Sequence, residues 1–112
     1  ERAFFEQDFS AINEVLHRVR KSLITGENLS ITDLDLSDII NFDRAETLVY
    51  ITLFQSGQKF IRYGSKRQDF QSTLNRDVEM LRKNKKFSDF DVSDEVKCRI
   101  MLLIGILFLR QN

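Results

Sequence analysis

Residues 47–63 constrain the fold more than any other part of the sequence. Eight consecutive strand-favouring residues, 47–54, precede a Ser-Gly pair, and a second aromatic run follows at 60–63. A Ser-Gly pair between two such runs is typical of a tight turn. Alternation places residues 49, 51 and 53 on one face and residues 50, 52 and 54 on the other. This pattern predicts a β-hairpin.

A helix is the alternative for the same segment. Asp43 is a capping residue three places before Glu46, which is the form of a capping box, and a helix over 44–56 would end at Gly57. The β-branched and aromatic residues of 47–54 are poor helix formers and favour the hairpin.

Two amphipathic helices flank the hairpin in sequence. From Phe5 to Leu23 apolar residues recur at spacings of three and four, which predicts a helix that stops at Gly26. A second helix is predicted from about residue 68 to 83, with residues 70, 74, 78 and 81 on its buried face.

The remaining segments are ambiguous. Residues 29–36 alternate in part, which fits a short edge strand or an irregular connection. A capping Ser93 and two acids predict a helix from Asp94, although the apolar run at 100–109 also fits a central strand.

The expected fold class is α+β: two amphipathic helices packed on a β-hairpin or small antiparallel sheet, with a buried apolar C-terminal helix. The alternative is an all-α bundle of five or six helices.

A short motif occurs twice. Residues 33–38 and 89–94 share the pattern Asp-apolar-Asp-apolar-Ser-Asp, and each follows an amphipathic helix. If the chain contains a duplication, residues 39–55 and 95–111 should have the same secondary structure.

The totals indicate one globular domain over residues 1–112, because 42% hydrophobic and 30% charged residues are ordinary for a folded chain. The sequence begins at Glu1 rather than Met, and we expect a fragment of a longer protein.

A single cysteine, Cys98, excludes an internal disulfide and favours a reducing, cytoplasmic or otherwise intracellular location. The longest apolar run is ten residues, too short to cross a bilayer as a helix, so no membrane role is expected.

Catalytic and metal-binding motifs are missing from the sequence. One histidine and one cysteine cannot supply a zinc tetrad, and neither Asp-rich motif has the Gly and Glu positions of an EF-hand. The four glycines never cluster into a phosphate-binding loop. We therefore predict no enzyme activity, metal, cofactor or small-molecule substrate.

Charge is distributed unevenly along the chain. Residues 1–56 contain ten acids and five bases, whereas residues 57–112 contain seven acids and twelve bases. We predict a non-catalytic protein-interaction or regulatory module of a larger protein, with self-association through its acidic and basic poles as one route. The alternative is a nucleic-acid-binding domain that uses the basic region 57–86 and its interleaved aromatics. The candidate binding residues are Lys59, Arg62, Tyr63, Lys66, Arg67, Arg82, Lys83, Lys85 and Lys86.

Overall fold

The computed structural model describes residues 10–36, 48–66, 69–92 and 98–104, and these form an α+β arrangement. This confirms the predicted fold class at that level. The elements follow the order α2 (Ser10–Thr25), β1 (Val49–Gln55), β2 (Gln58–Ser65), α3 (Phe70–Arg82), the short 3-10 helix η1 (Lys85–Asp89) and β3 (Cys98–Ile104).

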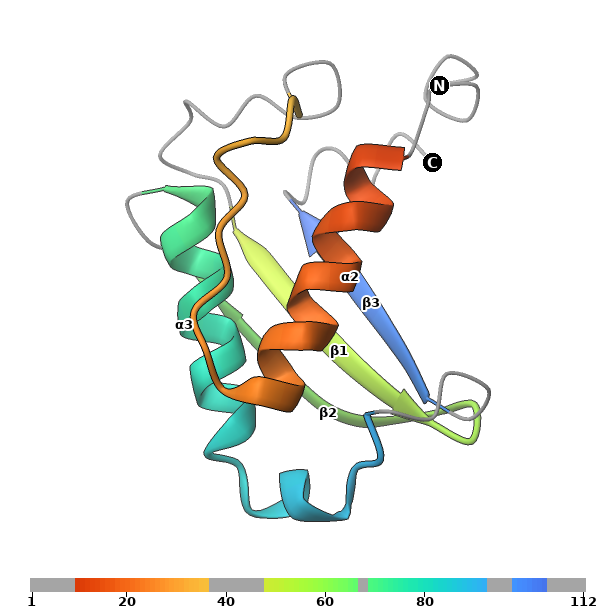
Figure 1. Ribbon diagram of the computed structural model, residues 1–112. Helices are drawn as coiled ribbons and strands as arrows, with labels where there is room; N and C mark the ends of the chain where they lie inside the picture. The colour runs from red at the N-terminus through yellow and green to blue at the C-terminus, as the bar shows by residue number, and fades with distance from the viewer. Residues whose placement is uncertain (1–9, 37–47, 67–68, 93–97, 105–112) are drawn as a thin grey trace.

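The strands form one antiparallel sheet in the order β2-β1-β3. Strand β1 lies in the middle, pairing Val49 with Ser65 of β2 and with Ile104 of β3. Both helices and the segment that follows α2 lie on one side of this sheet (Figure 1). Helix α3 packs on β1 and β2, and α2 packs on α3 and β3.

The predicted hairpin is confirmed, and its turn follows from local geometry. Ser56 and Gly57, the two turn residues, have φ angles of 54° and 79°. Two consecutive positive φ angles give the turn a twist that matches the right-handed twist of the flanking strands. The β1–β2 register shifts between Leu53 and Phe54, a bulge that leaves Phe60 out of the ladder.

Both predicted helices are present. The first ends at Thr25 and is followed by Gly26 with φ of 78°, as expected for a left-handed stop, while residues 1–9 lie outside the described part. The second begins after Asp69, whose carboxylate accepts the Ser72 N–H at 2.8 Å as an N-cap. It turns the four predicted apolar positions, Phe70, Leu74, Val78 and Leu81, into the core.

Residues 29–36, which fit either an edge strand or an irregular connection, form the irregular connection, and side chains of α3 bind the backbone of Leu29 and Ile31. The predicted C-terminal helix is corrected in part. Cys98–Ile104 form strand β3 rather than part of a helix, because they pair with β1 along its whole length. The other residues of the predicted C-terminal helix, 94–97 and 105–109, lie outside the described part.

The core lies between the sheet and the helical layer. Val15, Val19, Leu23, Val49, Ile51, Leu53 and Leu74 are almost completely inaccessible to solvent. The buried Asp77 of α3 accepts a hydrogen bond from Ser65 Oγ of β2 at 2.5 Å. This bond links α3 to the C-terminal end of the edge strand β2. No helix in the described part of the chain is long and apolar enough to cross a membrane.

The proposed duplication stays a prediction. Strands β1 and β3 fall within the two ranges that should match, yet β3 starts closer behind its Asp-rich motif than β1 does behind its own.

Candidate functional site

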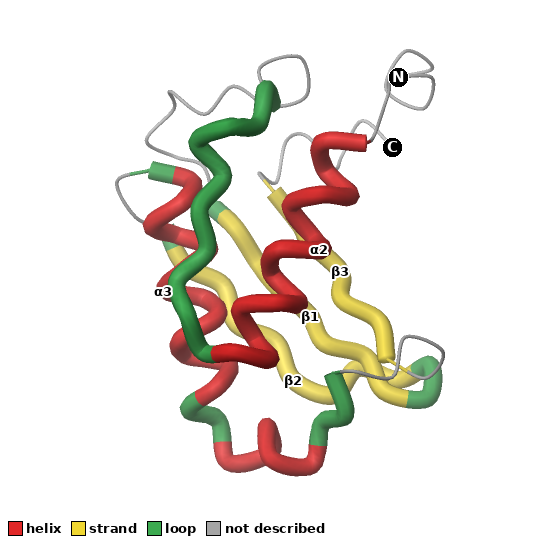
Figure 2. Tube along the Cα trace, in the orientation of Figure 1, coloured by secondary structure: helices red, strands yellow, loops and turns green. Residues whose placement is uncertain are grey.

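Residues 26–36 form a strap between the two helices, and the strap turns at 31–34, where the Leu34 N–H donates to the Ile31 carbonyl at 3.0 Å. Figure 2 shows this strap as a loop that passes between α2 and α3 on the helical side of the sheet. Its side chains alternate: Leu29 and Ile31 are buried, while Asn28, Ser30 and Thr32 are exposed. The strap therefore contributes apolar residues to the core as a strand would.

Helix α3 holds the strap through two side-chain amides one turn apart. The Asn75 amide oxygen accepts the Leu29 N–H at 2.9 Å, and the Asn75 amide nitrogen donates to the Leu29 carbonyl at 3.1 Å. Gln71 accepts the Ile31 N–H at 2.8 Å. Residues four apart share one face of a helix, so α3 presents a short ladder of groups that recognise extended backbone.

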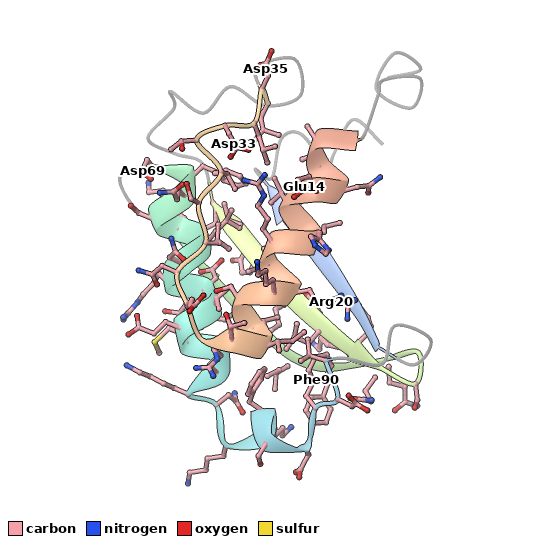
Figure 3. The ribbon with its side chains drawn as sticks, in the orientation of Figure 1. Glu14, Arg20, Asp33, Asp35, Asp69 and Phe90 are labelled. Carbon is pink, nitrogen blue, oxygen red and sulfur yellow. The ribbon has the colours of Figure 1, made fainter. Side chains whose placement is uncertain are left out.

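Helix α2 holds the opposite side of the strap. Arg18 donates to the Ser30 carbonyl at 2.7 Å and to both carboxylate oxygens of Asp33 at 2.6 and 2.9 Å. It also pairs with Glu14, one turn earlier, at 2.9 Å. Figure 3 shows Glu14 and Asp33 near the end of the helical layer where α2 begins.

This pairing changes the ionisation of both partners. The hydrogen bond from Arg18 lowers the pKa of the Asp33 carboxyl to about 2, and Asp33 and Glu14 raise the pKa of Arg18 above its ordinary value. Asp33 and Arg18 therefore stay charged across the physiological range.

A cleft of about 690 Å³ opens between the strap and α3, and we call it the strap cleft. A second cleft of about 410 Å³ lies on the α2 side, lined by residues that include His17, Lys21 and Glu27. The strap cleft has the larger net charge, because its four charged residues are three cations and one acid, whereas the second cleft has two of each. Its lining residues are Ser22, Gly26, Asn28, Gln71, Ser72, Asn75, Arg76, Val78, Glu79, Arg82 and Lys83.

Cations dominate the strap cleft. Glu79 is its single acid, paired with Arg76 at 3.3 Å and with Lys83 at 3.2 Å, and these cations lower the pKa of Glu79, Lys83 most strongly. Arg82 donates from Nε to the Leu23 carbonyl at 3.2 Å and so caps one of the last carbonyls of α2. Its guanidinium comes so close to Gly26 that a Cβ there would lie 2.9 Å from Nη1. The cleft thus has a net positive lining whose cations are held in place.

The structure divides the predicted binding residues into separate groups. Arg82 and Lys83 line the strap cleft, and Lys85 and Lys86 are exposed on η1. Lys66 follows β2 at its far end, about 20 Å along the strand from Phe60 at the rise of a β-strand. Since Phe60 stacks on Phe90 next to η1, Lys66 is far from the η1 cations. The basic region is therefore not one continuous patch.

The β2 residues are divided between the two faces of the sheet. Tyr63 alternates with Arg62 and is half-buried against the core on the helical side. Lys59 and Arg62 are exposed on the opposite side, in register with Phe54 and Thr52 of β1. Arg67 lies outside the described residues.

Sequence reasoning did not identify the residues that build the strap cleft. Gln71, Asn75 and Arg76 are polar positions on a predicted helix, and such positions are usually solvated. Only the i, i+4 spacing of Gln71 and Asn75 indicated a shared helix face, and nothing in the sequence showed that residues 26–36 would lie against it. Among the described residues no three His, Cys, Asp or Glu side chains lie close enough together to hold a metal ion.

A scan of protein-family models finds no match to this chain. A search of curated proteins and a search of solved structures likewise find no match. Its function is therefore inferred from its own residues.

Proposed function

We propose that this domain is a non-catalytic protein-interaction module that binds an acidic, extended polypeptide segment in the strap cleft. The observation that carries this proposal is a cleft of about 690 Å³ whose charged lining consists of three cations and one acid. A volume of this size is in the range of about 300–1,000 Å³ that is usual for ligand sites, which accommodates a few side chains.

The wall of the cleft already holds extended backbone. Gln71 and Asn75 bind the strap through amide groups, and such contacts do not depend on the side chains of the bound segment. Each amide nitrogen has two donor hydrogens, and Asn75 uses one of them on the Leu29 carbonyl. The same two side chains can therefore donate to the carbonyls of a partner segment that lies along the strap.

The charge of the cleft selects the partner. Arg76 and Lys83 share the single carboxylate of Glu79, which leaves positive charge for an incoming acid. Complementary charge mainly increases the association rate and the specificity, and salt screens it. We therefore expect binding of acidic peptides that weakens as the ionic strength rises.

The test is fluorescence anisotropy with a labelled peptide in which Asp and Glu alternate with Leu. The R76Q/K83Q double variant should weaken binding by about tenfold, since it removes two charge contacts of up to about 1 kcal/mol each. The matched control is K66Q, which removes an exposed cation outside the cleft. Absence of binding at low salt, or equal weakening by K66Q, would show that the strap cleft is not the site.

A further inference from the structure

Helix α3 and the strap lie side by side along the strap cleft (Figure 2). Asn75 holds the Leu29 backbone, and the Arg82 guanidinium lies against Gly26. The helix rises about 10 Å from Asn75 to Arg82, and the strap covers this stretch with the three residues from Leu29 to Gly26, as a strand-like chain would. A partner segment whose backbone contacts Asn75 therefore brings the side chain three residues away to the level of Arg82.

The lining of the strap cleft has more positive charge than one carboxylate can neutralise. It contains three cations, Arg76, Arg82 and Lys83, and one acid, which leaves a net charge of +2. An Asp or Glu of a partner brings one negative charge, whereas a phosphorylated side chain brings about 1.5 to 2 at neutral pH. The net charge of the lining therefore matches a phosphate better than a carboxylate.

The cations also have more N–H groups than the described residues use. The carboxylate of Glu79 spans two of them, with one oxygen 3.3 Å from Arg76 Nη1 and the other 3.2 Å from Lys83 Nζ. One anion can therefore reach both cations at once. Arg76 Nε is buried and has no hydrogen-bond partner in the described part of the chain. A guanidinium has five N–H donors and an ammonium three, so donors remain for a second anion.

The guanidinium of Arg82 is held in place on three sides. Its Nε donates to the Leu23 carbonyl at 3.2 Å, and its central carbon lies 6.0 Å from the centroid of the Phe87 ring. Gly26 leaves room for it, because a Cβ there would lie 2.9 Å from Arg82 Nη1. These contacts fix the planar group without using its Nη1 and Nη2 hydrogens. Such a preformed fork suits two oxygens of a phosphate.

We propose that the acidic group recognised in the strap cleft is a phosphorylated serine or threonine, held by Arg76, Arg82 and Lys83. This inference rests on the proposed peptide binding and specifies its ligand. The three acceptor oxygens of the phosphate take N–H groups from the Arg82 fork and from the other two cations. Glu79 competes with the phosphate for those two cations and therefore weakens binding.

The test uses the 112-residue chain and fluorescence anisotropy with three labelled peptides that differ only at one central position. This position is serine, glutamate or phosphoserine, and the flanking residues are neutral. The phosphoserine peptide should bind about tenfold more tightly than the glutamate peptide, because it adds charge and acceptor oxygens, and the serine peptide should bind most weakly. The peptide in which Asp and Glu alternate with Leu is measured alongside them.

The R82K variant separates the fork from the charge. Lysine keeps the positive charge but cannot bind two oxygens in one plane, so affinity for phosphoserine should fall about fivefold while affinity for glutamate changes less than about twofold. A variant that was merely destabilised would lose both affinities together. The matched control is R62K, because Arg62 is exposed on β2 and does not line the strap cleft. It should leave both affinities unchanged.

The E79Q variant should gain affinity, which damage to the fold would not produce. Removing the internal acid leaves Arg76 and Lys83 to the phosphate, so the phosphoserine peptide should bind about threefold more tightly. The matched control is D89N, which makes the same change in net charge at an exposed residue of η1 outside the cleft. It should leave the affinity unchanged.

The outcomes distinguish this inference from the proposed function. Equal affinity for the phosphoserine and glutamate peptides would overturn the phosphate assignment while acidic-peptide binding stands. No binding of any peptide at low salt would overturn both. An R82K variant that keeps the full preference for phosphoserine, or an E79Q variant that binds it no more tightly than D89N, would also contradict the assignment. Inorganic phosphate that competes as well as the phosphopeptide would make the cleft a general anion site.

Discussion

Replacing Asn75 with alanine tests whether side chains of α3 hold the strap. The substitution removes both hydrogen bonds to the Leu29 backbone, at 2.9 and 3.1 Å. Each is worth about 1 kcal/mol net, and Asn75 lines an open cleft where water can reach the freed groups, so the loss should be about 2 kcal/mol. Alanine raises helix propensity by up to about 0.7 kcal/mol, which leaves a net destabilisation of at least about 1.3 kcal/mol.

Urea unfolding followed by circular dichroism measures this loss, and hydrogen exchange locates it. Asn13→Ala is the matched control, because this exposed asparagine of α2 changes only helix propensity and should be neutral or slightly stabilising. Amide exchange of Leu29 should accelerate in the Asn75→Ala variant more than exchange in the sheet. An unchanged free energy of unfolding together with unchanged Leu29 exchange would refute the idea that Asn75 holds the strap.

Two further predictions concern the ends of the helical layer. Because the pKa of Asp33 is lowered to about 2, its pairing with Arg18 contributes stability above the ordinary Asp pKa, and this contribution is lost as the pH falls through about 2. An NMR titration of the Asp33 carboxyl should give this low pKa in the unmodified protein. In the R18Q variant the pKa of Asp33 should rise. An unshifted titration in R18Q would contradict this cause. Asp69→Ala removes the N-cap of α3 and should cost about 1 kcal/mol in urea unfolding, whereas Asp69→Asn, which keeps an acceptor for the Ser72 N–H, should cost less.

The hairpin and the two helices could be predicted because their signals are local. The Ser56-Gly57 turn, the alternation of β1 and the three- and four-residue spacings of both helices each depend on neighbours within a few positions. Alternation also separated the two faces of β1, and in the structure Val49, Ile51 and Leu53 form the face that is buried in the core.

Strand β3 and the strap could not be predicted, because distant partners determine them. The run at Cys98–Ile104 is apolar enough for a helix or a strand, and only its pairing with β1 decides between them. The strap has the alternation of a strand, but Asn75 and Gln71 satisfy its backbone in place of a strand neighbour. Of the predicted site residues, Arg82 and Lys83 line the strap cleft. Gln71 and Asn75 also line it, but the sequence did not indicate this, because polar residues on a helix are usually solvated.

The middle position of β1 has consequences for the order in which the chain folds. Its hairpin with β2 closes through a two-residue turn, and α3 follows directly, so these elements can form early from contacts close in sequence. The β1–β3 ladder must wait, because even its closest pair, Gln55 and Cys98, is separated by β2, α3 and η1. During synthesis β1 therefore emerges long before β3 and presents an unpaired, strongly apolar edge. A nascent chain that stops before β3 should be prone to strand-to-strand aggregation, and β3 closes that edge last.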